Sequence, residues 1–575
     1  MPHIANPKFG TVSRLDLQII DLWKTISPAL AYTIGFDECA GKLFVPTDAH
    51  IEEVRRRIGL LGRRADNELQ RKTLDSMEAA LEFDEPAPLL DDITNAIFNH
   101  LVKDGPKSRN LLPLLNDGQA VIEACIKRYQ AKSVPIAVKI LALYRIDGLV
   151  KILDSLLDTT SAGEVQKECK ELKARVSALA SILQVEGFGK GTFEEVERIF
   201  EKSMFDLGRE RFYTKAVRMA YGYHERPQEL EAKGIAWLEE ELPKLRDVTR
   251  ELAEIYGCED DVDSVVAHLD KRTRIPPSGL IETSAELRGV IQRLVDENIV
   301  KVNPKYVTRV IETPAYLSAI LPTAFVIFFD TFKHPYQMHL MTTDSARDPV
   351  RSVPQLINLL VHEEYGHCLH HSNSAMHFGG NPSAIELIYT SIQIPVTEGL
   401  AFNREREFME VVKELESRGQ ASLNRSERAY TEMAKRFGGL HLLNLEIEFQ
   451  TRRNRVVRFL RVIGDVWMNT GKHGLLEFLD WAQEKTGESR RHVFYQIFPA
   501  HEGMFPGYAT TYAIVGEEIG SIELTLRDRD ARIRFSTFLT GIGYVPRRLY
   551  RRRLEQFAKG LTSGKTVALS RARRS

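Results

Sequence analysis

The chain gathers side chains that could do chemistry in one short stretch, NLLVHEEYGHCLHHSNSAMH at 358–377, which holds five of its sixteen histidines. Two neutral imidazoles on one helix can hold a divalent metal ion, and a glutamate beside the first can take a proton from water. His362 and Glu363 form such a pair. Zinc would lower the pKa of a bound water toward neutrality, where a carboxylate completes its activation. The expected chemistry is hydrolysis.

The spacing of the histidines differs from the usual four residues, because Gly366 stands four residues after His362 and the next histidine is His367. Successive residues of an α-helix turn by about 100°, so two residues five apart point about 140° away from each other. A single π-type bulge absorbs one extra residue, and such bulges occur often at functional sites. Gly366 lowers the cost of a local distortion. The stretch therefore predicts a metal site if the helix is locally widened.

Other arrangements stay open on spacing alone. His371 lies four residues after His367, which is the usual chelating distance, and Glu363 lies four residues before His367. His370, His371 and His377 can equally belong to a polar helix surface, with imidazoles that are satisfied by backbone groups or water.

A third ligand is expected from a later helix, because mononuclear zinc sites often add a glutamate and leave one position for water. Glu398 and Glu405, in TEGLAFNREREF, are seven residues apart and share one face of a helix. One of them can ligate the metal while the other braces a histidine through a hydrogen bond.

The segment FPAHEGMFPGYATTYAIVGEEIG at 498–520 offers hydrogen-bond donors. Tyr508 and Tyr512 are four residues apart, with His501 just upstream. Amide hydrolysis develops negative charge on the former carbonyl oxygen, and a tyrosine hydroxyl or an imidazole aimed at it would stabilise that charge. The alternative is a Pro-Gly turn that enters an amphipathic helix with core tyrosines.

The helix that carries the histidines has recognisable start signals. Ser352 suits the N-cap and Pro354 suits the first turn. Leu356, Leu359 and Leu360 then form an apolar stripe that ends where the histidines begin.

Helical periodicity dominates the chain, as in 51–83, 161–184 and 234–257, where apolar residues recur every three to four positions. Near residue 304 the sequence pattern changes to short runs of β-branched and aromatic residues that are interrupted by prolines. Such runs predict short strands. Helices resume at Val353.

We therefore expect a mainly α protein in two parts, an N-terminal helical lobe at 1–303 and a catalytic half at 304–575 that ends in a basic C-terminal segment. The complete pattern predicts a large two-lobed metallopeptidase with a deep cleft and a small β-sheet beside the active-site helix. No low-complexity linker separates the two parts, so they are not expected to fold independently.

The bulk composition excludes few classes of protein. The 575 residues are 43% hydrophobic and 27% charged with a net charge of −1, as in an ordinary soluble protein without a global pull toward nucleic acid or membrane. Ten lysines and arginines face one acid in 547–575, a segment that could touch phosphates, although a solvated helix face is the simpler explanation. The most apolar segment, 316–329, is too short for a membrane helix, which needs about 20 residues.

Five scattered cysteines fit neither a disulfide framework nor a Cys-x-x-Cys metal knuckle, and the first residues lack the features of a signal peptide. The simplest setting is a reducing cytoplasm.

These motifs resemble those of a known group of enzymes. HEEYGH has the H-E-x-x-G-H form found in dipeptidyl peptidase III, a zinc peptidase. The wider layout is similar to the gluzincin-like family named domain of unknown function 885, in which a histidine helix is followed by E-G-x-A-x-x-x-E and later by P-G-x-A-x-x-Y. Here the latter two are EGLAFNRE at 398–405 and PGYATTY at 506–512. The proline that usually precedes the glycine of the histidine helix is missing.

The resemblance implies one Zn²⁺ ion held by His362, His367 and Glu398, with Glu363 as general base and acid. It also implies that Tyr512, together with Tyr508 and His501, stabilises the oxyanion, a set of donors that completes the predicted catalytic residues.

The expected function is a zinc-dependent metallopeptidase acting on short peptides. One alternative is a zinc-dependent hydrolase or lyase acting on a non-peptide small molecule. A second is a non-catalytic helical binding protein that uses its basic tail on nucleic acid.

Overall fold

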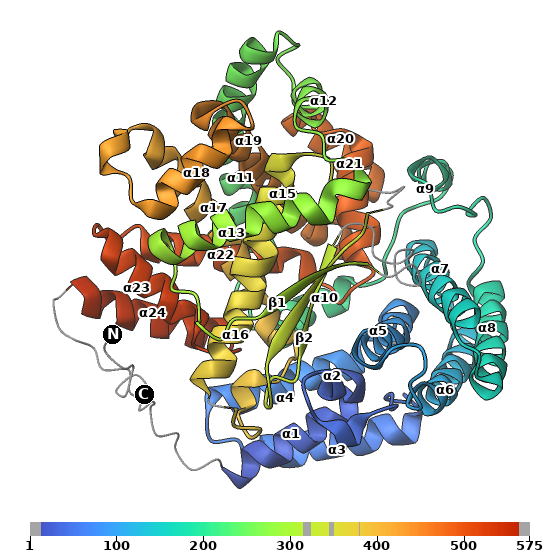
Figure 1. Cartoon of the computed structure of the whole chain (residues 1–575). Coiled ribbons are helices and arrows are strands. Elements are labelled where there is room, and N and C mark those ends of the chain that lie inside the picture. Colours follow the sequence, from blue (N-terminus) through green and yellow to red (C-terminus); the bar gives the residue numbers. More distant parts are fainter. Residues whose placement is uncertain (1–12, 314–323, 344–349, 379, 563–575) are drawn as a thin grey trace.

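The computed structural model describes residues 13–313, 324–343, 350–378 and 380–562 (Figure 1). Helices account for nearly all regular structure up to residue 300 in these ranges: α1 (Arg14–Ile26), α2 (Pro28–Thr33), η1 (Asp37–Cys39), α3 (Asp48–Gly62), α4 (Glu68–Glu82), α5 (Pro86–Asp104), α6 (Leu111–Gln130), α7 (Ile136–Thr159), α8 (Gly163–Leu183), α9 (Phe193–Phe200), α10 (Glu210–Ala220), α11 (Pro227–Tyr256), α12 (Val262–Arg272), η2 (Pro277–Gly279) and α13 (Leu280–Asn298). Side chains such as Thr47, Asn67 and Asp261 cap several of them by accepting a backbone N–H.

Three short strands form a small mixed sheet where the sequence predicts strands: β1 (Thr308–Glu312), β2 (Ala324–Phe329) and β3 (Tyr336–Met341). Their order is β1-β3-β2, with β1 parallel and β2 antiparallel to β3. The prediction of a mainly α protein with a small sheet is confirmed. The first part of the apolar segment 316–329 lies outside the described residues.

Helices resume after the sheet and continue to the end of the described chain: α15 (Val353–Leu360), η3 (Val361–Cys368), α16 (Leu369–His377), η4 (Ile385–Leu387), η5 (Ser391–Gln393), α17 (Ile394–Glu416), η6 (Gln420–Ser422), α18 (Arg425–Lys435), α19 (Leu440–Asn469), α20 (Leu475–Thr486), α21 (Arg490–Ile497), η7 (Phe498–Glu502), η8 (Tyr508–Thr510), α22 (Thr511–Glu523), α23 (Arg529–Thr540) and α24 (Arg547–Thr562). None of the described helices combines the length and the hydrophobicity that crossing a bilayer requires.

The helix from Val353 to His377 runs through the middle of the molecule beside the sheet (Figure 1). Ser352 occupies its N-cap and Pro354 lies in its first turn, as expected, but the Ser352 hydroxyl makes no capping hydrogen bond. The apolar stripe packs into a core that includes Leu356, Leu360 and Ile291 of α13. The histidines that follow are therefore held on a helix anchored by burial at its start.

The two halves of the chain share hydrophobic core. Apolar side chains of α11, such as Leu238 and Leu245, lie in one buried cluster with Phe449 and Leu460 of α19. Figure 1 shows α11 and α19 close together in the upper part of the molecule. A boundary between lobes near residue 303 stays a prediction.

Candidate metal centre

The central part of the histidine helix is a π-helix, η3, which contains His362 and His367. The expected widening of the helix is thus confirmed, and it extends over the eight residues of η3 rather than a single bulge. The two imidazole rings lie with their centroids 4.9 Å apart and their planes nearly perpendicular. Both side chains are buried.

Gly366 has a reason for being glycine that differs from the expected one. Its φ is not in the left-handed region, so the backbone here does not require conformational freedom. A Cβ atom at this position would instead lie 2.6 Å from Cβ and 2.7 Å from Cα of Ala401 in α17. The absence of a side chain therefore lets α17 approach the histidine helix closely, which brings the acids of α17 to the imidazoles.

Glu398 of α17 completes a group with the two histidines. Its Oε2 lies 3.9 Å from Nε2 of His362 and 3.6 Å from Nε2 of His367, and one ligand atom from each residue lies within 4.8 Å of the others. Ligands at about 2.0–2.2 Å from a tetrahedral zinc ion are about 3.4 Å apart. The three side chains are therefore already close to the separation that such an ion requires.

The hydrogen bonding of these three residues fits a set of metal ligands. Oε2 of Glu398, the atom that faces both imidazoles, is buried and has no hydrogen-bond partner among the described residues. Burial raises the pKa of Glu398 and lowers that of His367 well below the usual range, so His367 is a neutral imidazole with a lone pair to donate. A carboxylate and two neutral imidazoles form the donor set typical of zinc.

Glu405 lies on the other side of His362. Its Oε1 is 2.6 Å from Nδ1 of that imidazole, which therefore donates, and Arg458 of α19 donates to Oε2 of Glu405 at 2.8 Å. Although burial alone would raise it, Arg458 and His362 lower the pKa of Glu405 to about 2. An acid that accepts from Nδ1 fixes the orientation of the ring, with Nε2 turned toward Glu398, as a metal ligand must be.

The two neighbouring glutamates of HEEYGH have different surroundings. Glu364 is buried and accepts hydrogen bonds from Arg288 of α13 at 2.7 and 2.8 Å, and it also contacts Nδ1 of His339 on β3 at 3.1 Å. This acid ties the helix to α13 and the sheet. Glu363 is half-buried, and its carboxylate makes no hydrogen bond to any described residue. Of the two acids, Glu363 is therefore the one available to a substrate or a water molecule.

Tyr508, Tyr512 and His501 meet beside the three candidate ligands. The Tyr508 hydroxyl donates to Oε1 of Glu398 at 3.0 Å. His501 lies on the π-helix η7, and its Nδ1 donates to the Gln496 carbonyl at 2.8 Å. Its Nε2 is then free to accept from the Tyr512 hydroxyl, 3.4 Å away. Burial raises the pKa of both tyrosines, so both carry a proton at neutral pH and can donate it in a hydrogen bond.

The remaining histidines of the helix do not join this group. His370 and His371 are buried, not on the surface, and the alternative pairing of His367 with His371 is not formed. Nδ1 of His371 lies 2.9 Å from the Tyr544 hydroxyl, and its ring stacks on Phe328 of β2. These histidines belong to the packing between the helix, the sheet and the segment around Tyr544.

The buried histidines predict a loss of stability in acid. Burial lowers the pKa of His370 to about 4 and that of His371 to about 3, whereas both return to about 6.5 in the unfolded chain. Protons then bind preferentially to the unfolded chain, so the free energy of unfolding falls as the pH drops below about 6.5. Each histidine contributes about 1.4 kcal/mol per pH unit down to its folded pKa.

The test is urea unfolding of the metal-free protein between pH 7.5 and 5. The variant His371→Gln cannot titrate at this position, and its unfolding free energy should fall less steeply than that of the wild type. The exposed His224 provides the control, since His224→Gln should keep the wild-type slope. Equal slopes for all three proteins would contradict the assignment.

Two arginines near the site were missed in the sequence analysis. Arg458 contacts both Glu405 and Nδ1 of His362, and Arg461 lies with its guanidinium carbon 4.9 Å from the centre of the Tyr512 ring. Arginines at 455, 458 and 461 recur every three residues, separated by the apolar pairs at 456–457 and 459–460 of α19. Buried arginines in such a run are a signal that could have pointed to this helix.

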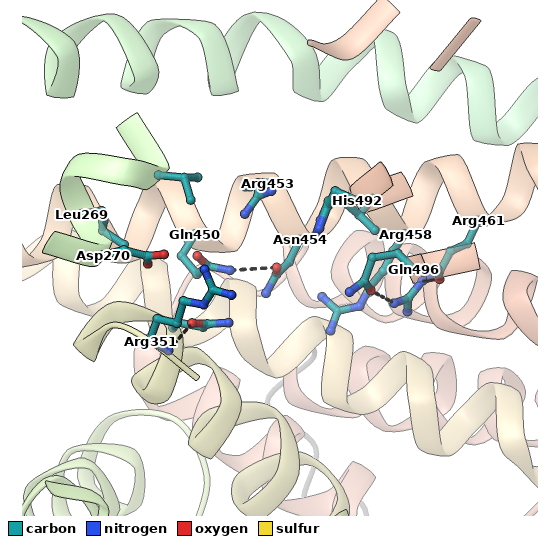
Figure 2. A pocket seen from close by; sticks show the side chains of 13 residues that line it. Leu269, Asp270, Arg351, Gln450, Arg453, Asn454, Arg458, Arg461, His492 and Gln496 are labelled. Carbon is teal, nitrogen blue, oxygen red and sulfur yellow. Dashed lines mark hydrogen bonds between the residues drawn. The ribbon is translucent and has the colours of Figure 1, made fainter. Parts of the chain in front are cut away.

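Arg458 and Arg461 line a pocket of about 300 Å³ beside the candidate metal centre (Figure 2). The largest share of its residues comes from α19, and the others come from α12, α21 and the segment at the start of α15. The residues are Val266, Leu269, Asp270, Arg351, Gln355, Gln450, Arg453, Asn454, Val457, Arg458, Arg461, His492 and Gln496. Because Arg458 also contacts His362, it belongs both to the pocket and to the surroundings of the candidate metal ligands.

Comparison with known proteins supports the fold alone. No family model matches the chain, and no curated protein matches its sequence. Its fold is similar to that of a predicted lipoprotein of unknown function from Shewanella oneidensis, with a TM-score of 0.62 and 14% identity over 95% of this chain and 100% of that chain. It is also similar to that of a predicted lipoprotein from Colwellia psychrerythraea, with a TM-score of 0.57 and 12% identity over 96% of this chain and 100% of that chain. A predicted oligoendopeptidase F from Bacillus anthracis str. Ames aligns over 92% of this chain and 98% of its own at 12% identity, with a TM-score of 0.21, too low to carry an argument.

Proposed function

We propose that this chain is a zinc-dependent metallopeptidase that hydrolyses short peptides. The observation that carries the proposal is the convergence of His362, His367 and Glu398, with the buried Oε2 of Glu398 left without a hydrogen-bond partner among the described residues. The resemblance of the sequence motifs to the gluzincin-like family named domain of unknown function 885 agrees with this ligand set and is part of the proposal.

A bound zinc ion would act as a Lewis acid that polarises a carbonyl group and acidifies a coordinated water. Glu363 would take a proton from the attacking water and return it to the leaving amine. On turning from their resting acceptors, Glu398 and His501, the hydroxyls of Tyr508 and Tyr512 would donate to the oxygen on which negative charge develops. His501 accepts from Tyr512 in the resting structure and so orients that hydroxyl.

The positions of the two histidine ligands depend on side chains that do not react. Glu405 and Arg458 orient His362, while Glu364, through Arg288 and His339, ties the same helical turn to α13 and the sheet. Such partners are needed because a catalytic arrangement loses much of its rate when its geometry shifts by about 1 Å.

The expected setting is a reducing compartment, here proposed to be the cytoplasm. All five cysteines of the chain are free, and Cys39, Cys125, Cys169 and Cys368 are buried. Such thiols are compatible with a reducing environment. The two similar structures are named as lipoproteins, which favours the cell envelope instead, and fractionation of cells with an antibody against the chain would separate the two locations.

The proposal is tested by metal analysis and hydrolysis of a peptide library by the same preparation. We expect about one zinc per chain, loss of hydrolysis on chelation and recovery with one equivalent of zinc. A panel of acyl-amide and ester metabolites assayed in parallel separates the peptidase from a zinc-dependent hydrolase or lyase that acts on other small molecules. A purified protein that binds no metal stoichiometrically would leave only a non-catalytic binding role.

A further inference from the structure

The pocket beside the metal centre is lined mainly by polar and basic side chains. Four arginines take part, and two of them have acidic partners that neutralise them: Arg453 is paired with Glu488 at 2.7 Å, and Arg458 with Glu405 at 2.7 Å. Arg351 is exposed to solvent at the edge. Arg461 differs from these three, because it is buried and forms no ion pair with any described acid.

The contacts of Arg461 are all to uncharged groups. Its Nε donates to the Gln496 carbonyl at 3.2 Å, its Nη2 donates to Oε1 of Gln496 at 2.7 Å, and its guanidinium lies over the Tyr512 ring. Burial lowers the pKa of Arg461 below its ordinary value and Arg458 adds to this effect, although Tyr512 and Glu398 act in the opposite direction. Glu398 acts on this guanidinium only from beyond ion-pair distance, and a buried cation that touches no acid is costly, so an anion that enters the pocket would relieve an existing cost.

Two of the four side-chain amides of the pocket are arranged to donate into it, whereas Gln450 and Asn454 donate to other amides of the protein. Gln355 accepts the backbone N–H of Arg351, and Gln496 accepts from Arg461. Each of these glutamines thus uses its side-chain oxygen within the protein, and neither side-chain NH₂ group donates to a described residue in the hydrogen bonds of the structure. Donors of this kind together with a guanidinium are complementary to a carboxylate.

The position of the pocket connects such an anion to the reaction. Arg458 lines the pocket and lies 3.3 Å from Nδ1 of His362. Tyr512, one of the expected oxyanion donors, lies directly against Arg461. Figure 2 shows Arg458, Arg461 and Gln496 together at one end of the pocket, with Gln450 and Asn454 farther along α19. Only the side chains of Arg458 and Tyr512 therefore lie between a substrate group held by Arg461 and the candidate metal ligands.

We propose that Arg461 binds the C-terminal carboxylate of a peptide whose susceptible bond lies at the metal centre, so that the enzyme removes residues from the C-terminus. The volume of about 300 Å³ lies at the lower end of the range for small-molecule pockets and suits a chain end rather than a continuing chain. The inference rests on the proposed peptidase function and specifies its substrate class.

The test compares matched peptides that differ only at the C-terminus. Wild-type protein should hydrolyse a peptide with a free carboxylate at least tenfold more efficiently, in kcat/KM, than the same peptide as its amide, as expected for loss of a hydrogen bond to a charged group. The variant Arg461→Met should remove most of this preference, and Arg461→Lys should restore part of it. Arg436→Met, which removes the same charge from an exposed position, should behave as the wild type.

Binding without turnover gives a readout that is independent of activity. Calorimetric titration of metal-free Glu363→Gln protein should show tighter binding of the free-acid peptide than of the amide, and Glu363→Gln/Arg461→Met should bind both alike. The melting temperature of Arg461→Met should not fall, because an arginine without an acidic partner adds little to stability. A clear fall in melting temperature with the acid preference unchanged would show a structural arginine and overturn the inference.

The outcomes separate the inference from the proposed function. Hydrolysis of acid and amide peptides at equal rates would overturn the carboxylate site and keep the peptidase. Hydrolysis of neither, with a binding preference for the acid that depends on Arg461, would overturn the peptidase and keep the carboxylate site. A third peptide, amidated at its C-terminus but carrying a glutamate near its end, tests whether the pocket binds a side-chain carboxylate instead. If this peptide binds as tightly as the free-acid peptide, the pocket recognises a side chain and the C-terminal inference is overturned. Binding of inorganic phosphate alone would overturn it as well.

Discussion

The variant Glu363→Gln should lose peptide hydrolysis by a factor of at least about 100, within the range of about 10²–10⁴ that a positioned general base contributes. It should keep one bound metal ion per chain. The reason is that glutamine has nearly the same shape but cannot accept a proton, while the candidate ligands His362, His367 and Glu398 are unchanged. The measurement is kcat/KM for one peptide, paired with metal content of the same sample.

The neighbouring acid offers a matched control. Glu364→Gln makes the same substitution one residue later, where the carboxylate accepts from Arg288 and contacts His339 instead of facing the site. This variant should melt at a lower temperature, because it leaves a guanidinium and an imidazole without a charged partner, and it should retain most of its turnover per folded molecule. If Glu363→Gln keeps wild-type turnover, the assignment of the base is wrong.

The variant His367→Ala should lose its metal, falling from about one ion per chain to near zero, and should be inactive. Two remaining ligands, His362 and Glu398, bind a divalent ion much more weakly than three in a closed geometry. Elemental analysis of protein purified from zinc-supplemented medium gives the metal content directly. Melting curves with and without added zinc give a second measure, since an ion that binds the folded chain raises its stability.

Two further substitutions should give an intermediate loss of metal binding and no loss, respectively. Glu405→Gln removes only the acid that braces His362, and such changes typically weaken metal binding by about 10–100-fold without abolishing it. His377→Ala changes a histidine at the end of the same helix, away from the candidate ligands, and should retain the full metal content. A His367→Ala protein that holds one tightly bound zinc would remove the basis of the proposed hydrolysis.

Local pattern was enough to predict much of the fold and the centre of the site. The five-residue interval between His362 and His367 predicted a widened helix, because an ideal α-helix would turn the two imidazoles away from each other. The structure has a π-helix, η3, at this place. The β-branched and aromatic runs after residue 304 became β1, β2 and β3. Both predictions rest on geometry that is contained in a few consecutive residues.

The features of the site that the sequence did not predict depend on contacts between segments that are distant in the sequence, and a single sequence does not display such contacts. Glu363 and Glu364 are identical in type and adjacent, and only the positions of Arg288 and His339 distinguish the half-buried acid at 363 from the fully buried one at 364. Arg461 looks like any other basic residue of α19 until the absence of a described acidic partner is seen. Likewise, the burial of His371 follows from Phe328 and Tyr544, which no periodicity in the helix itself reveals.

The close approach at Gly366 recurs on the opposite side of α17. A Cβ atom at Gly399 would lie 2.6 Å from Cβ of Val515 and 2.7 Å from the backbone nitrogen of Gly516 in α22. Three main chains are thus stacked in direct contact, and one added methyl group at either position would push the layers apart and move Glu398 from the imidazoles. Over evolutionary divergence, glycine at 366 and 399 should persist together with the three candidate ligands. In relatives too distant for ordinary sequence comparison, this five-position fingerprint would be the trace of a common ancestor.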